Sequence, residues 1–117
     1  MLWVGMVVAL GAAKAEFPHF ALSRSVPAAD ATVTSPAEVR LWFTEAAAAG
    51  SAGIRVVDPA GAAVETGEVV QSAEDAKVYS VAVGRRLAGG RYTVSWRGVG
   101  DDGHTVQGTF AFTVSAE

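Results

Sequence analysis

Alternation of apolar and polar side chains, repeated in short segments, leaves this chain few folds other than β-structure. In Val39–Phe43 the odd-numbered residues are apolar and would share one face, because side chains alternate along a β-strand. Arg40 and Trp42 would lie on the opposite face. The same two-residue period recurs in residues 92–97 and 110–114. Residues 54–57 and 78–83 are predicted as further strands, and residues 21–25 as a weaker one. We therefore predict a series of half-buried strands that each turn one face to a common core.

Turn signals separate these segments and set the fold class. Clusters of Pro, Gly, Asp and Ser occur at residues 27–30, 35–36, 58–61 and 88–90, and the Ala-rich segment 45–52 is predicted to be a loop because it is bounded by glycines. This spacing predicts an all-β, immunoglobulin-like Greek-key β-sandwich or barrel of about seven strands. Its expected core anchors are large aromatic side chains: Phe43, Tyr92, Trp96, Phe110 and Phe112.

Composition narrows the function. With 117 residues, half of them hydrophobic, the chain is expected to form one domain with one core. A formal net charge of −3 at pH 7 gives no basic surface for nucleic acid or for electrostatic membrane docking. The sequence contains no cysteine, so disulfides and thiolate chemistry are excluded.

The N-terminal segment predicts export. Residues 2–13 are almost purely apolar, and Ala13-Lys14-Ala15 follows them as a small-x-small pattern of the kind that signal peptidase cleaves after. The apolar run is shorter than the roughly 20 residues that a transmembrane helix needs. We therefore predict a signal peptide at residues 1–15 and a mature domain at residues 16–117, located in the periplasm or otherwise exported.

Asp102-Gly103-His104 lies between two alternating segments and is typical of a tight turn, in which an exposed histidine is the ordinary outcome. A second interpretation is a metal site, because in extended backbone Asp102 and His104 project to the same side, about 7 Å apart at Cα. His19, the other histidine of the chain, would add a third ligand. Mixed nitrogen and oxygen ligands favour Cu(II), with zinc second, whereas calcium and magnesium prefer oxygen alone.

Several motifs occur in a fixed order along the mature domain. A histidine near its start is followed by a Phe-Thr-Glu strand end, then Tyr-x-Val-x-Trp, Asp-x-His and Gly-x-Phe-x-Phe-x-Val. The residues concerned are His19, Phe43 to Glu45, Tyr92 to Trp96, Asp102 to His104, and Gly108 to Val114. In this order the chain resembles the CopC family of periplasmic copper-resistance proteins. The resemblance implies an immunoglobulin-like β-barrel that binds Cu(II) through His19, Asp102 and His104, with Glu45 nearby.

Two departures from the family pattern bear on the metal site. Some members hold Cu(I) in a methionine-rich loop, but here the only methionines, Met1 and Met6, lie in the predicted signal peptide, so no Cu(I) site is expected. In the family the histidine is often the first residue after cleavage, and its amine and ring bind together. Cleavage after Ala15 would leave three residues ahead of His19, including Pro18, which has no amide hydrogen to lose. Either processing also removes Pro18, or His19 binds through its ring alone.

The expected function is a copper carrier or buffer rather than an enzyme, because no nucleophile is paired with a base in a recognisable pattern. We expect a monomer that binds copper ion and delivers it to an inner-membrane copper-transport protein. Two alternatives stay open. A histidine-brace copper mono-oxygenase would need the free amine of His19, and a metal-free adhesion or carbohydrate-binding sandwich could use Trp42 as a stacking platform. For Glu45, a solvated surface carboxylate is the simpler interpretation.

Overall fold

The computed structural model describes residues 19–116, so the predicted signal peptide lies outside the described part of the chain. Within this range no helix has the length and apolar character needed to cross a bilayer. The described residues form eight strands: β1 (Leu22–Val26), β2 (Thr32–Val33), β3 (Glu38–Phe43), β4 (Gly53–Val57), β5 (Val70–Gln71), β6 (Val78–Ala82), β7 (Gly90–Val99) and β8 (Thr105–Val114).

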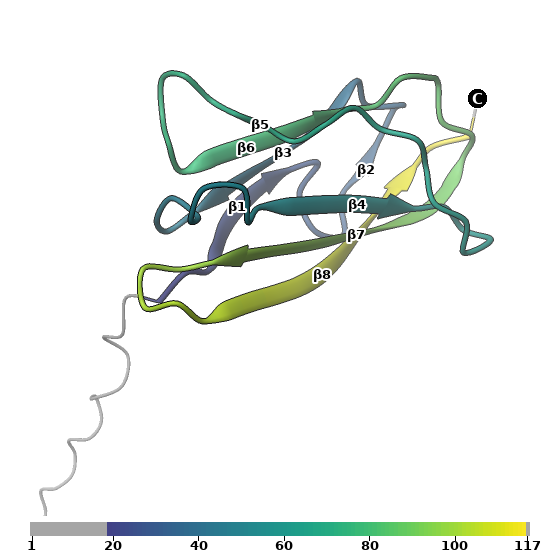
Figure 1. The fold of residues 1–117 in the computed structure, drawn as a ribbon. Helices are drawn as coiled ribbons and strands as arrows, with labels where there is room; N and C mark the ends of the chain where they lie inside the picture. Colours follow the sequence, from purple (N-terminus) through teal and green to yellow (C-terminus); the bar gives the residue numbers. More distant parts are fainter. Residues whose placement is uncertain (1–18, 117) are drawn as a thin grey trace, which may run out of the picture.

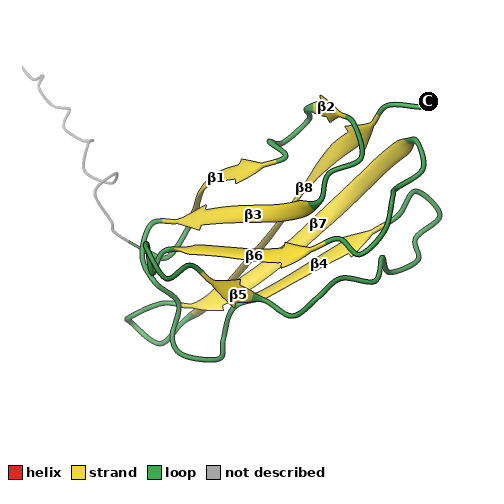
Figure 2. Ribbon diagram, turned by 90° about the horizontal axis from the view of Figure 1, so that it is seen from above, coloured by secondary structure: helices red, strands yellow, loops and turns green. Residues whose placement is uncertain are grey.

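The strands form two four-stranded sheets, in the orders β1-β3-β6-β5 and β2-β8-β7-β4. Neighbouring strands are antiparallel except β2, which runs parallel to the end of β8. The sheets lie as two layers whose strands cross at an angle (Figures 1 and 2). The chain is therefore an all-β Greek-key sandwich, as the alternating pattern predicted, with β7 and β8 forming its longest hairpin.

The core lies between the two layers and is made from the inward-facing residues of each strand. In β3 the residues Val39, Leu41 and Phe43 are buried, whereas Arg40 and Trp42 are only half-buried on the outer face. In β7 the even-numbered residues from Tyr92 to Trp96 are buried in the same way. The two-residue period thus gave the correct inward face for both strands.

An aromatic cluster fills the end of the core that lies below the turn between β7 and β8. The ring of Phe20 stacks on Phe43 with centroids 4.5 Å apart, and Trp96 packs against Phe43 at 5.3 Å. Two glycines leave room for these rings. A Cβ on Gly98 would lie 2.5 Å from Phe20, and one on Gly108 would lie 2.6 Å from Trp96. We call Phe20, Phe43 and Trp96 the aromatic cluster below.

Some expectations need correction. Phe110 is only half-buried, because it lies beside β1 at the open side of the sandwich, so it is not a core anchor of the same kind as Phe112, which is fully buried. The eight strands agree with the prediction of about seven, although two of them, β2 and β5, are only two residues long and were not predicted individually. Such short strands carry no readable period. Residues 45–52 form a loop, as predicted.

Candidate metal centre

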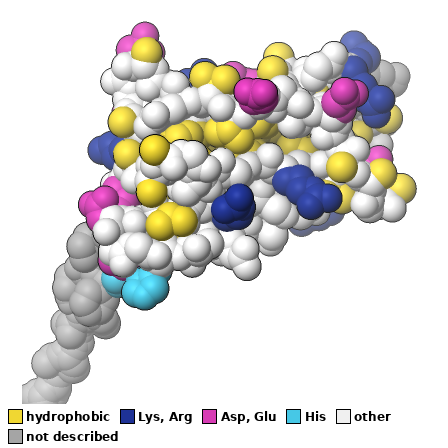
Figure 3. All heavy atoms as spheres, in the orientation of Figure 1, with side chains coloured by type: hydrophobic (Ala, Val, Ile, Leu, Met, Phe, Trp, Pro, Cys, Tyr) yellow, Lys and Arg dark blue, Asp and Glu magenta, His cyan; other side chains and the backbone are white. Residues whose placement is uncertain are grey.

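Two segments that are far apart in the sequence meet at one end of the sandwich. The turn that joins β7 to β8 lies beside the segment that leads into β1 (Figure 1). His104 belongs to this turn and His19 begins the described chain. The histidine side chains lie at the surface next to acidic side chains at this end of the molecule (Figure 3).

The turn after β7 is closed by its own backbone. The N–H of Gly103 donates to the carbonyl of Gly100 at 2.9 Å, and Gly100 donates in turn to the carbonyl of His104 at 3.1 Å. Gly103 has a φ of 85°, a left-handed conformation that favours glycine. Inside the turn, Oδ1 of Asp102 accepts the backbone N–H of His104 at 3.0 Å. The side chains of Asp102 and His104 therefore converge through a turn and not through extended backbone, which corrects the reason given above for their proximity.

His19 is positioned by the residues that follow it. The next residue, Phe20, is 2% exposed and anchors the segment in the aromatic cluster. The side-chain hydroxyl of Thr44 donates to the carbonyl oxygen of His19 at 2.8 Å. Because Phe20 points inward, the neighbouring His19 lies on the solvent side, where its side chain is 62% exposed.

One carboxylate oxygen joins the two histidines. Oδ2 of Asp102 lies 3.3 Å from Nδ1 of His19 and 3.2 Å from Nδ1 of His104. The Asp102 side chain is 42% exposed and that of His104 is 82% exposed. Three of the four residues proposed as metal ligands thus lie in direct contact at an open surface, although they come from opposite ends of the described chain.

These contacts are not yet a metal site. Within residues 19–116, no group of three or more His, Asp or Glu side chains is already arranged to hold a metal ion. The separations are close to those that a metal needs, because two donors 3.2–3.3 Å apart can both reach one ion with bonds of about 2.0 Å at an angle of about 105–110°. In a tetragonal Cu(II) site the donors would draw together by a few tenths of an ångström, to about 2.8 Å. Two imidazole nitrogens and one carboxylate oxygen are a donor set that fits copper.

The same contacts keep Asp102 ionised. The backbone N–H of His104 lowers the pKa of the Asp102 carboxyl most, followed by the His104 side chain, with smaller contributions from the charges of His104 and His19. Partial desolvation opposes these effects by raising the pKa. The net shift is downward, so Asp102 is a carboxylate over the pH range in which an imidazole becomes neutral and able to bind a metal.

Glu45 lies beside this group. A Cβ on Gly100 would be 2.9 Å from Oε2 of Glu45 and 3.5 Å from Oδ1 of Asp102, so the two carboxylates border the same space. The ion-pair contacts described above join Asp102 to the histidines, and Glu45 is adjacent to them. Glycine at position 100 allows this approach, because any larger residue would meet the Glu45 carboxylate.

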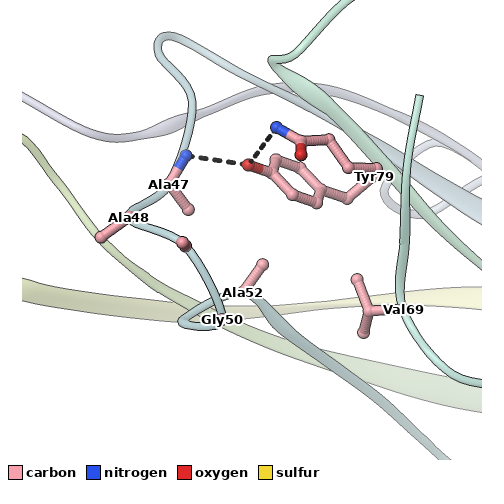
Figure 4. A pocket seen from close by; sticks show the side chains of 8 residues that line it. Ala47, Ala48, Gly50, Ala52, Val69 and Tyr79 are labelled. Atoms are coloured by element: carbon pink, nitrogen blue, oxygen red, sulfur yellow. Dashed lines mark hydrogen bonds between the residues drawn. The ribbon is translucent and has the colours of Figure 1, made fainter. Parts of the chain in front are cut away.

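The loop that carries Glu45 is fixed at two points. The N–H of Ala48 donates to the carbonyl of Val99 at 2.8 Å, next to the turn. The N–H of Ala47 donates to the hydroxyl of Tyr79 at 3.0 Å, and the Gln71 side chain donates to the same oxygen at 3.1 Å (Figure 4). Tyr79 is buried, so it ties the loop to the core. These contacts hold Glu45 near Asp102.

Trp42 lies on the outer face of the other sheet. The guanidinium carbon of Arg24 lies 4.1 Å from the centroid of the Trp42 ring, an arrangement that is typical of a cation–π contact. Arg24 and Trp42 are also register partners in β1 and β3. One face of the indole is thus covered by an arginine and is not open for stacking a sugar.

The sequence analysis assigned no role to three residues that build this end of the molecule: Phe20, Thr44 and Gly100. Phe20 precedes a weakly patterned strand, and Gly100 carries no side chain. Thr44 was part of the Phe-Thr-Glu motif, but nothing in its local sequence indicates that its hydroxyl would contact residue 19. An inventory of hydroxyl residues at strand ends could have raised Thr44 as a candidate, without naming its partner.

Comparison with known proteins places the chain in a family. The model of the CopC domain matches residues 22–115. Protein YobA of Escherichia coli strain K12 is 33% identical over 97 residues, which cover 82% of this chain and 78% of the relative. Copper resistance protein C of Xanthomonas campestris pv. juglandis is 32% identical over 116 residues, which cover 95% of this chain and 91% of the relative.

Solved structures agree with this assignment. CopC from Methylosinus trichosporium OB3b superposes with a TM-score of 0.76 at 30% identity, covering 85% of this chain and 96% of that protein. PcoC, a methionine-rich copper resistance protein from Escherichia coli, superposes with a TM-score of 0.75 at 30% identity, covering 83% and 99%. By domain, sequence and fold, the chain belongs to the CopC family, which includes copper resistance proteins.

Proposed function

We propose that this chain is an exported protein that binds Cu(II) and carries or buffers it, with His19, Asp102 and His104 as the ligands. The observation that carries this proposal is the pair of contacts from Oδ2 of Asp102 to Nδ1 of both histidines, at 3.3 and 3.2 Å. Membership of a copper resistance family supports the choice of copper. The donor set supports Cu(II) over Cu(I), because imidazole and carboxylate are harder ligands than thioether or thiolate.

The open surface of the site suits a carrier. All three proposed ligands are at least 42% exposed in their side chains, so a second protein or a small chelator could reach the ion without unfolding the domain. We propose an inner-membrane copper-transport protein as the recipient and the periplasm as the compartment. In this proposal Glu45 is an adjacent carboxylate that adds negative charge beside the ion, and not a fourth inner ligand.

Copper titration of the secreted chain against a competing Cu(II) chelator tests the proposal. His19→Ala and His104→Ala should each weaken Cu(II) binding by about 100-fold or more, since even the loss of a residue that only supports a ligand commonly costs 10- to 100-fold. Asp101→Asn is the matched control, because it removes a neighbouring exposed carboxylate and should leave the affinity within about twofold. Histidine variants that bind copper as tightly as the wild type would contradict the proposal.

Two further measurements refine the proposed ligand set and metal preference. Competition with zinc should show tighter Cu(II) binding, as the Irving–Williams order requires of a mixed nitrogen and oxygen site. The mass of the secreted chain shows where the mature protein begins. A chain that begins at His19 would add its amine to the ligand set, and one that begins at residue 16 would bind through the ring.

A further inference from the structure

Thr44, the residue after β3, holds the backbone on both sides of Phe20. Its N–H donates to the carbonyl oxygen of Ala21 at 2.9 Å, and its hydroxyl oxygen accepts the N–H of Ala21 at 3.0 Å. The hydroxyl hydrogen is donated to the carbonyl oxygen of His19 at 2.8 Å. A hydroxyl has one hydrogen to donate and two lone pairs to accept, so this single side chain can make both bonds at once. It ties residues 19 and 21 to the end of β3.

We propose that Thr44 is a positioning residue for the copper site. Its hydroxyl fixes the main chain of His19 so that the ring faces Asp102, and it keeps the His19 carbonyl oxygen in a hydrogen bond and away from the metal. Thr44 itself does not bind copper. This inference rests on the proposed function, because it assigns a role at the same site.

Phe20 and Thr44 hold the segment in different ways, which explains why a hydroxyl is needed at position 44. Phe20 is buried, and the contact of its ring with Phe43 in the aromatic cluster anchors the segment to the core. The ring of His19 lies on the other side of the chain, 62% exposed, where packing cannot fix it. A hydrogen bond to the carbonyl of His19 reduces the freedom of the backbone at the residue that carries the ligand. Loss of this bond would let the imidazole sample more orientations, and copper would have to order it on binding.

Thr44→Val is the sharpest substitution, because valine has nearly the same shape and lacks the hydroxyl. The substitution removes the bond to His19 and the bond from the N–H of Ala21. We expect Cu(II) affinity to fall by about three- to tenfold, the range that corresponds to the bond to the residue that carries the ligand. The electron paramagnetic resonance spectrum of bound Cu(II) should also change, because the nitrogen and oxygen donors shift around the ion. Thr44→Ser keeps the hydroxyl and should restore both the affinity and the spectrum. Thr109→Val removes an exposed strand hydroxyl on β8 and should behave as the wild type.

Coupling to His19 separates positioning from a general effect on the fold. In a His19→Ala background, Thr44→Val should leave the remaining Cu(II) affinity unchanged within about twofold. An equal loss of affinity in both backgrounds, an unchanged spectrum in Thr44→Val, or failure of Thr44→Ser to restore binding would each overturn the inference. Thr44→Ala provides a second hydroxyl-free variant if the valine protein does not fold. A wild-type chain that fails to bind Cu(II) would contradict the proposed function instead.

Discussion

Two layers of residues meet at the end of the sandwich that carries the proposed copper site, and they differ in almost every physical respect. The inner layer, the aromatic cluster, is dry and closely packed, and Phe20 is 2% exposed. The outer layer is polar and open, and the side chain of His104 is 82% exposed. The layers are one residue apart along the chain, since Phe20 belongs to the first and His19 to the second. Stability should therefore depend on one layer and metal binding on the other.

Acid should show the difference between the two layers most strongly, because it should weaken copper binding at the outer layer and leave the fold around the inner layer intact. Imidazole binds a metal only in its neutral form, so lowering the pH from 7 to 4 should weaken Cu(II) binding strongly, because protons compete with the ion for the ring nitrogens. The lowered pKa of Asp102 keeps this carboxylate ionised further into acid than an ordinary aspartate, so it contributes less to the loss of binding. Chelator competition at each pH measures the loss. Unchanged affinity from pH 7 to pH 4 would argue against histidine ligation, and circular dichroism should show the sheets intact at both values.

Phe20→Ala should lower both the stability of the fold and the affinity for copper, because it alters the inner layer next to His19, a proposed ligand. Loss of this buried ring should lower the free energy of unfolding by about 3–5 kcal/mol, measured by urea denaturation of the metal-free protein. Copper affinity should fall as well, since His19 loses its anchor. Phe110→Ala is the control, because Phe110 is half-buried and lies away from the site. It should destabilise less and leave copper affinity unchanged, and equal losses of affinity in both variants would contradict the anchoring role of Phe20.

Two glycines at the end of β7 allow a finer comparison. Gly98→Ala would place a Cβ 2.5 Å from the Phe20 ring and should destabilise the fold by about 1–3 kcal/mol through overpacking. Gly100→Ala would place a Cβ 2.9 Å from the Glu45 carboxylate, a side-chain end that can move away, and 3.0 Å from Cβ of Phe20. We expect Gly100→Ala to destabilise less and to change copper binding more. Thermal unfolding measures the stability of both variants, and copper titration measures their affinity. If Gly100→Ala destabilised the fold more and changed copper binding less than Gly98→Ala, stability and metal binding would not depend on different layers at this position.

The smallest effect should come from Asp102→Asn in the metal-free protein. The folded-state pKa of Asp102 is lowered, so the carboxylate stabilises the fold above its unfolded-state pKa, and this contribution is lost as the pH falls through the lower folded-state value. The variant should therefore be slightly less stable than the wild type near pH 6 and equal to it in acid strong enough to protonate Asp102 in the folded state. Urea unfolding at both values tests this. A stability difference that persists in strong acid would point to a cause other than the charge.

The strands were predictable because burial on one face produces a period that can be read directly. Val39, Leu41 and Val94 are each 0% exposed, at the positions where alternation places them. Phe110 belongs to the same pattern but is half-buried, since alternation gives the face of a residue and not whether another element covers that face. The short strands β2 and β5 depend on partners distant in sequence, and their own residues carry no pattern.

The site was predictable in its residues and less so in its geometry. Asp102 and His104 were identified as neighbours, but the turn that brings them together depends on backbone bonds of Gly100 and Gly103. The proximity of His19 to Asp102 is a contact between segments more than 80 residues apart; the count of histidines made His19 a candidate third ligand and the family resemblance supported it, but no local pattern predicts the contact. Thr44 was missed because a hydroxyl can bond to any nearby backbone group, and its choice of partner is set by the fold.

The buried ring of Phe20 also determines which residue stands beside Asp102. Inward and outward side chains alternate, so a slip of the segment by one position would place the imidazole in the aromatic cluster and the phenyl ring in water. Phe20 therefore fixes the register of the segment from the C-terminal side of the ligand. A chain trimmed to His19 and a chain that keeps residues ahead of it would present the same ring at the same place. In the proposed site, the position at which a mature chain begins would then change the strength of binding through the amine alone, without moving the imidazole.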